Sequence, residues 1–112
     1  MQISFSAWLV FLAAAVLEVS GDAVIRKGLR GGGLVLIAVG FIVLGCYGTI
    51  VNLVPWDFSR LLGVYVAVFA TVSVLCGLFV FGESIPVSTW LGLVIIILGG
   101  LVIQFGPMVS FQ

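Results

Sequence analysis

The sequence predicts an all-α membrane protein in which four transmembrane helices form a single domain over residues 1–112. Hydrophobic residues make up 63% of the chain and charged residues only 7%, whereas a soluble domain carries about 25% charged residues. Mean hydropathy is +1.46. The length allows about four spans of about 20 residues and leaves almost nothing for a soluble domain. We therefore expect a multi-pass integral protein of the plasma (inner) membrane.

Composition also excludes several function classes. The formal net charge is zero and no basic cluster forms, so we expect no nucleic-acid partner. Histidine is absent, which removes the usual zinc ligand and neutral-pH base. We expect no metal, no cofactor and no enzymatic activity. Cys46 and Cys76 lie inside apolar runs and are expected to be small buried residues rather than a disulfide or metal site.

The first span is predicted over residues 5–25, and a basic segment follows it before glycines 31–33 break the helix. Residues 1–6 carry no basic charge and no convincing cleavage site follows, so we expect no cleaved signal peptide. Glu18 lies deep in this span, where an ionised carboxylate costs roughly 2.5–3.5 kcal/mol. Helical spacing places a mostly small and apolar set on its face: Phe11, Ala14, Ala15, Gly21, Asp22 and Ile25. This pattern predicts a carboxylate facing a cavity within the membrane.

The second span is predicted over residues 34–54, with a stripe of small residues at Gly40, Gly45 and Gly48. Tyr47 and Asn52 are its polar side chains, and either could serve the site or the packing. A loop at residues 55–60 leads to the third span, predicted over residues 61–81.

A tight loop at residues 82–86 precedes the fourth span, predicted over residues 89–105. Ser88 is the expected N-cap, and Gly106 with Pro107 is expected to end the helix. Gly92 and Gly99 are seven residues apart and share one helical face. That face suits close contact with a second protomer, so we expect a dimer; packing within the protomer is the alternative.

Four spans place both termini and the 55–60 loop on one side of the membrane. Tryptophans 8, 56 and 90 fall near span ends, as an aromatic belt requires. Arg26, Lys27 and Arg30 mark the first loop as cytoplasmic, against Arg60 alone on the opposite side.

Two readings of the acidic residues follow from their positions. In low dielectric Glu18 can hold a proton and release it when a cation arrives, which couples proton and substrate at one site. The alternative is a structural acid bonded to a neighbouring helix. Asp22, one turn on, either extends the anionic site toward a divalent or elongated cation, such as a polyamine, or pairs with Arg26 four residues later. Glu83 is expected to be a solvated loop residue.

Several motifs resemble the small multidrug resistance transporters of the drug/metabolite transporter superfamily. The segment from Leu17 to Gly21 is similar to the family's first-helix motif, and a basic residue follows at Arg26. Phe81-Gly82-Glu83, with Trp90 and Gly92, resembles the superfamily's signature between its last two helices. The spacing from Arg60 to Tyr65 also resembles a less characterised branch. The resemblance covers nearly the whole chain.

The resemblance implies an antiparallel dimer in which two copies of Glu18 share one chamber and exchange protons for a cationic or hydrophobic substrate. It places Ala14, Ala15 and Gly21 on the chamber lining, with Tyr65 as an aromatic wall that can stack on a cation. A helix-packing role for Tyr65 is the alternative.

The chain departs from the family pattern at three points. Ala67-Val68-Phe69 replaces the glycine-valine-glycine kink, Gly40 and Tyr47 give span two a different aromatic pattern, and Asp22 replaces a hydroxyl residue. The leading hypothesis is a proton-coupled exporter of small organic cations or hydrophobic metabolites. The alternatives are half of a heterodimer for a polyamine or lipid-linked substrate, and a non-transporting assembly subunit or channel-like pore.

Overall fold

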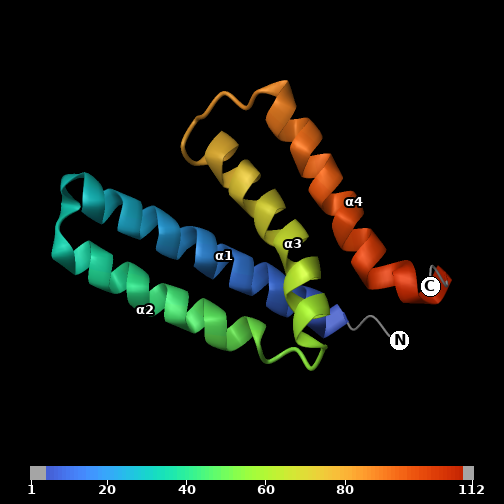
Figure 1. Cartoon of the computed structure of the whole chain (residues 1–112). Helices are drawn as coiled ribbons and strands as arrows, with labels where there is room; N and C mark the ends of the chain where they lie inside the picture. Colours follow the sequence, from blue (N-terminus) through green and yellow to red (C-terminus); the bar gives the residue numbers. More distant parts are fainter. Residues whose placement is uncertain (1–4, 110–112) are drawn as a thin grey trace.

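A computed structural model describes residues 5–109 and confirms the all-α fold class. Four helices, α1 (Phe5–Lys27), α2 (Leu34–Val51), α3 (Phe58–Phe79) and α4 (Val87–Val109), account for most of this part of the chain (Figure 1). A short wide helical turn, η1 (Gly28–Gly32), joins α1 to α2. Each of the four helices is long and apolar enough to cross a membrane. The protein is therefore a multi-pass integral membrane protein.

The loop between α2 and α3 spans residues 52–57, three residues earlier than the predicted 55–60. Helix α2 ends at Val51, and the Asn52 side chain then donates to the Gly48 carbonyl at 2.7 Å. The residue before Pro55 is biased away from helical geometry, which keeps the chain from continuing. Helix α3 begins at Phe58, and the Leu61 amide donates to the Asp57 carbonyl at 2.8 Å. Asp57 thus occupies the N-cap position, which aspartate favours.

Both expected ends of the last helix need correction. Helix α4 begins at Val87, so Ser88 lies inside it rather than at its N-cap; the Thr89 amide donates to the Pro86 carbonyl at 3.0 Å. Gly106 and Pro107 do not stop the helix, which continues to Val109. Pro107 has no N–H for the carbonyl four residues earlier, and the end of α4 bends away from its axis (Figure 1). Because little helix follows, the chain tolerates this lost bond.

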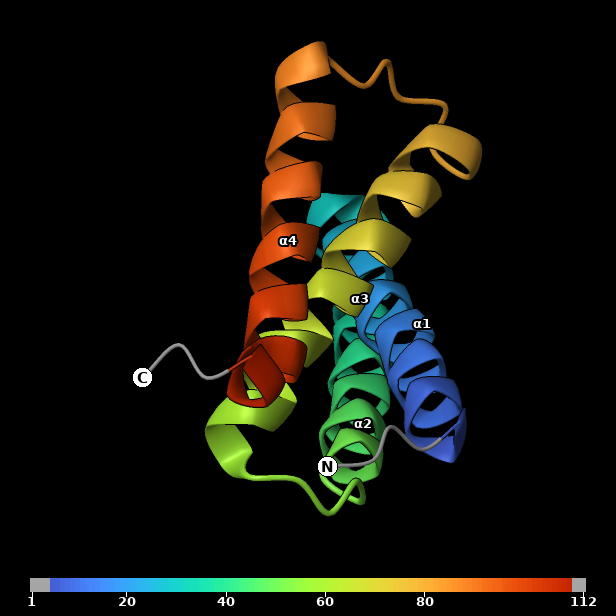
Figure 2. The same cartoon turned by 90° about the vertical axis from the view of Figure 1, so that its right-hand side faces the viewer.

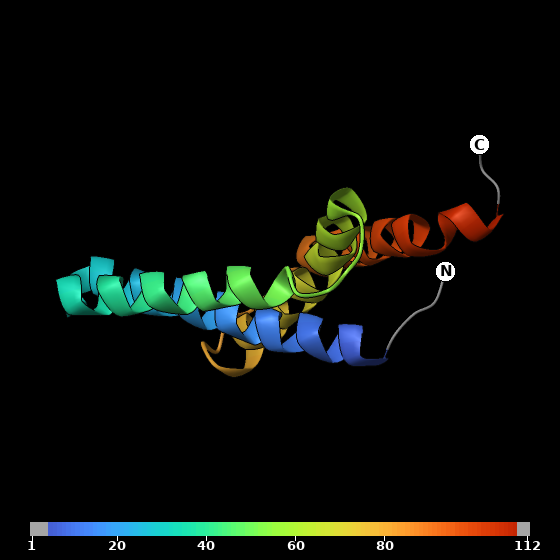
Figure 3. The same ribbon diagram turned by 90° about the horizontal axis from the view of Figure 1, so that it is seen from below.

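The helices form two hairpins that meet along α1 and α3. Helix α1 packs against α2 and α3, whereas α4 packs only against α3 among the described elements. Figure 2 shows α3 between α4 and α1. The molecule is elongated, with extents of 51 × 34 × 21 Å. The α1–α2 turn and the C-terminus of α4 lie at opposite ends of its long axis (Figure 3). Within residues 5–109, helix α4 therefore has a single helix neighbour, α3.

Glycines bring α1 and α2 into close contact. A Cβ atom at Gly21 would lie 2.7 Å from the Leu44 side chain and 3.2 Å from the Gly40 carbonyl oxygen. A Cβ atom at Gly40 would collide with Ile25 and lie 2.9 Å from the Gly21 carbonyl oxygen. Small residues permit this approach of two membrane helices. Gly92 and Gly99 differ, because a Cβ atom at either would meet nothing within 4 Å.

Both cysteines are free, but the expectation that both are buried is wrong, because Cys46 is exposed and Cys76 is only half-buried. Its helix, α2, also exposes Phe41 and Ile42 by 66% and 68%. An outward apolar surface of this kind suits hydrocarbon rather than water.

Candidate functional site

A hydrogen bond between α1 and α3 marks the candidate site. The Tyr65 hydroxyl donates to Glu18 Oε1 at 2.9 Å, although the two residues are 47 positions apart in the chain. Tyr65 is only 3% exposed, and Glu18 is half-buried. A charge-assisted bond of this kind fixes the carboxylate against α3. The intramembrane acid therefore has a specific partner on a neighbouring helix.

Aromatic rings from three helices surround Tyr65. Tyr47 of α2 stacks on it with ring centroids 5.5 Å apart and planes inclined by 26°, and Phe69 lies 6.4 Å away at 30°. Phe11 of α1 presents an edge at 5.8 Å. Phe11, Tyr47, Tyr65 and Phe69 form what we call the aromatic wall. Ring faces attract cations, most strongly in a desolvated setting. A carboxylate beside such a wall suits an organic cation.

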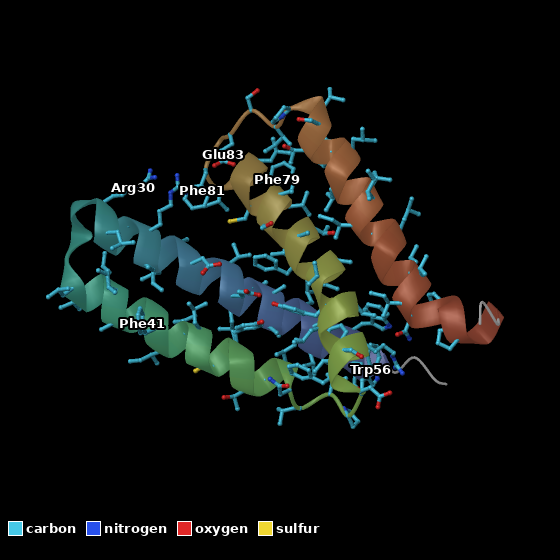
Figure 4. All side chains as sticks on the ribbon, in the orientation of Figure 1. Arg30, Phe41, Trp56, Phe79, Phe81 and Glu83 are labelled. Carbon is cyan, nitrogen blue, oxygen red and sulfur yellow. The ribbon has the colours of Figure 1, made fainter. Side chains whose placement is uncertain are left out.

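The aromatic contacts continue from Phe11 to Trp56 and Trp8. Trp56 meets Phe11 edge-on at 5.2 Å, and Trp8 lies 6.3 Å from Trp56. The Arg60 guanidinium carbon lies 4.0 Å from the centroid of the Trp56 ring, and its Nε donates to Gln104 Oε1 at 3.2 Å. Figure 4 shows Trp56 where the start of α3 meets the neighbouring helices.

An open cavity of about 470 Å³ reaches the aromatic wall at Phe69. Phe69 lines it together with Asp22, Arg26, Arg30 and Glu83. Figure 4 shows Arg30, Phe81 and Glu83 around the opening between α1 and the end of α3. Asp22 makes no ion pair with Arg26 within the described chain. Asp22 thus lines an open cavity one turn from Glu18.

The other residues predicted to form the chamber divide between two surroundings. Ala14 and Ala15 are completely buried beside the aromatic wall. Gly21 instead faces α2, at its contact with Gly40. Gly92 is half-buried and Gly99 exposed, so both lie open on α4. Glu83 is exposed, as expected, but its carboxyl group also contacts Gly77.

Sequence reasoning named Trp56 only as part of an aromatic belt and Phe69 only in a departure from the family's kink motif, and it did not consider Gln104. Aromatic residues are common in apolar spans, so their number alone did not identify the ones that stack. Gln104 carried a usable signal, because a polar amide inside an otherwise apolar span calls for a partner. Among residues 5–109 the structure shows no cluster of Cys, Asp or Glu able to hold a metal ion.

Comparison with known sequences places the chain in a family. Residues 4–109 match the family described as "Uncharacterised BCR, YnfA/UPF0060 family". The chain belongs to the YnfA/UPF0060 family. A UPF0060 membrane protein of Saccharopolyspora erythraea is 35% identical over 88% of this chain and 91% of its own length. One of Mycobacterium marinum is 34% identical over 88% and 92%, and one of Synechocystis is 31% identical over 87% and 91%.

The YnfA/UPF0060 family lies within the drug/metabolite transporter superfamily, so the predicted superfamily is confirmed. The match does not show that the chain belongs to the small multidrug resistance family itself. No solved structure matches the chain.

Proposed function

We propose that this YnfA/UPF0060 protein is a proton-coupled exporter of small organic cations or hydrophobic metabolites, and not an enzyme. The observation that carries the proposal is the bond from Tyr65 to Glu18 inside a membrane-spanning bundle. A carboxylate at that depth is costly and marks a functional site by default. The aromatic wall beside it supplies the apolar surface that a bulky cation needs.

In this mechanism proton and cation compete for Glu18. Protonated Glu18 is neutral, which suits the membrane interior. A cation reaching the aromatic wall stabilises the carboxylate, and the proton leaves. Release of the cation on the other side requires protonation again. Because Glu18 binds either a proton or a cation and not both, each can bind only when the other leaves. Transport of the cation is therefore coupled to movement of protons in the opposite direction.

Two copies of the chain are part of the proposal. Among residues 5–109 of one protomer, α4 packs only against α3, and a Cβ atom at Gly92 or Gly99 would meet no atom within 4 Å. We place a second copy on that face, which resembles the arrangement of the small multidrug resistance transporters. A heterodimer with a related chain would use the same face. Antiparallel insertion is the arrangement that the resemblance favours.

The test is pH-gradient-driven uptake of a fluorescent organic cation into proteoliposomes. Glu18→Gln keeps the shape of the side chain but cannot ionise, so it should abolish uptake. Glu18→Asp should retain uptake with a shifted pH profile. Asp57→Asn, which removes an exposed carboxylate away from the cavity, is the matched control and should transport normally. Normal uptake by Glu18→Gln would favour the non-transporting assembly subunit instead.

A further inference from the structure

Gln104 is a buried amide with half of its hydrogen bonding unmet. It is only 1% exposed, and its Oε1 accepts from Arg60 Nε at 3.2 Å. Its Nε2 is buried without a partner in the described chain. The amide cannot simply flip, because that would place N–H groups against N–H groups. An unmet donor inside a membrane helix is expensive, and a small shift of the side chains that cover Nε2 would let an acceptor from outside the protomer reach it.

Arg60 also has N–H donors without a partner among the described residues. It is the cation of the terminal side of the bundle, and no carboxylate of residues 5–109 forms an ion pair with it. One face of its guanidinium lies over Trp56 and its Nε bonds Gln104. The remaining N–H donors of the fork match the oxygens of a phosphate. Arg60 and Gln104 thus hold donors for one anionic group.

An apolar groove of about 360 Å³ leads away from Gln104 between α3 and α4. Leu12, Val68, Val72, Leu75 and Leu101 are among its lining side chains. It follows residues 64–75 of α3, which is about 16 Å at 1.5 Å per residue. One leaflet of a bilayer has a hydrocarbon depth of about 15 Å. The groove is therefore as long as one leaflet is deep.

We propose that this groove binds a bilayer phospholipid, with one acyl chain along α3 and α4 and its phosphate at Arg60 and Gln104. Trp8 and Trp56 lie at the same end of the groove, as residues of a membrane interface do. A free anion would use the polar end alone and leave the groove unexplained. A second protomer at Gly99 would occupy another side of α4, because the neighbouring Gly100 is the glycine that faces the groove and contacts Ala67. The proposal does not depend on the transport mechanism.

The test titrates delipidated protein with phosphatidylglycerol and counts bound lipid by native mass spectrometry. We expect one tightly held lipid per protomer. Arg60→Gln and Gln104→Leu should each weaken it about tenfold, the effect of losing a charge-assisted hydrogen bond. Lys27→Gln, which removes a cation at the other end of the bundle, should leave it unchanged. Val68→Phe should weaken lipid binding by filling the groove while Arg60 stays intact.

Two further ligands separate the sources of affinity. Diacylglycerol, which lacks the phosphate, and inorganic phosphate, which lacks the tails, should each bind at least about tenfold more weakly than the phospholipid. Equal binding of either would overturn the proposal, as would a Lys27→Gln loss equal to that of Arg60→Gln. An interprotomer disulfide at Leu101→Cys would also overturn it, because the groove would then be a protein interface. Circular dichroism checks each fold, and Arg60→Lys gives a milder variant that should lose part of the affinity.

Discussion

The helices of this protein differ in how they use their small and polar residues. Around Glu18, the helices α1, α2 and α3 meet through a hydrogen bond, stacked rings and the close glycine contact of Gly21 with Gly40. In the part of the chain that the structure describes, helix α4 touches only α3 and leaves Gly92 and Gly99 without a neighbour. Chemistry and packing are therefore concentrated in three helices. The fourth carries surface suited to something outside the protomer.

The largest expected contrast is between two glycine substitutions. Gly40→Leu places a side chain where a single Cβ already collides with Ile25, so it should destabilise the protomer by about 1–3 kcal/mol. Gly99→Leu meets no such neighbour and should leave protomer unfolding unchanged while weakening the dimer. Thermal unfolding in detergent and in-membrane crosslinking measure the two effects. If the wild-type protein is monomeric at every protein-to-lipid ratio, α4 does not form a dimer interface.

Deleting the Tyr65 hydroxyl tests whether its hydrogen bond to Glu18 contributes to cation binding. Tyr65→Phe keeps the stack with Tyr47 and Phe69 but removes the bond to Glu18. Hydrogen bonds to charged groups contribute about 1.5–3 kcal/mol, so cation affinity should fall at least about tenfold. Tyr47→Phe, one ring further out, should have a smaller effect. Isothermal titration with a monovalent organic cation gives the affinities of both variants. An equal loss of affinity in the two would mean that the Tyr65–Glu18 hydrogen bond does not contribute specifically to cation binding.

A smaller effect is expected at the rim of the 470 Å³ cavity. Asp22 is exposed and unpaired with Arg26, so it is available as a second anionic contact. Asp22→Asn should weaken a divalent or elongated cation by up to about fivefold, because an exposed charge is well screened. A monovalent cation should bind as before. If stability falls instead and both cations bind normally, the residue serves the helix and not the ligand.

Much of this organisation could be predicted from the sequence. The low charge content and four apolar runs predicted the fold class, and Glu18 stood out because an acid is rare inside a span. Tyr65 was reached through family resemblance and not through periodicity.

What could not be predicted depends on contacts between helices. Helical period places residues on faces but does not say which face meets which, so the stacking of Phe69 and the Arg60–Gln104 bond were missed. Gly21 shares a helical face with Glu18, yet it packs against α2 because Gly40 leaves room there. The end of α4 was misjudged because proline close to a helix terminus interrupts few bonds.

The central claim is that Glu18 exchanges a proton for a cation. The most direct measurement adds a monovalent organic cation to purified protein in weakly buffered solution and records the pH. Wild-type protein should release protons on binding, and its affinity should fall as the pH is lowered, because protonation neutralises the carboxylate. Glu18→Gln should lose both effects, while Asp57→Asn, away from the cavity, should keep both. Cation binding by the wild type with no proton release, or with the same pH profile as Glu18→Gln, would contradict the account.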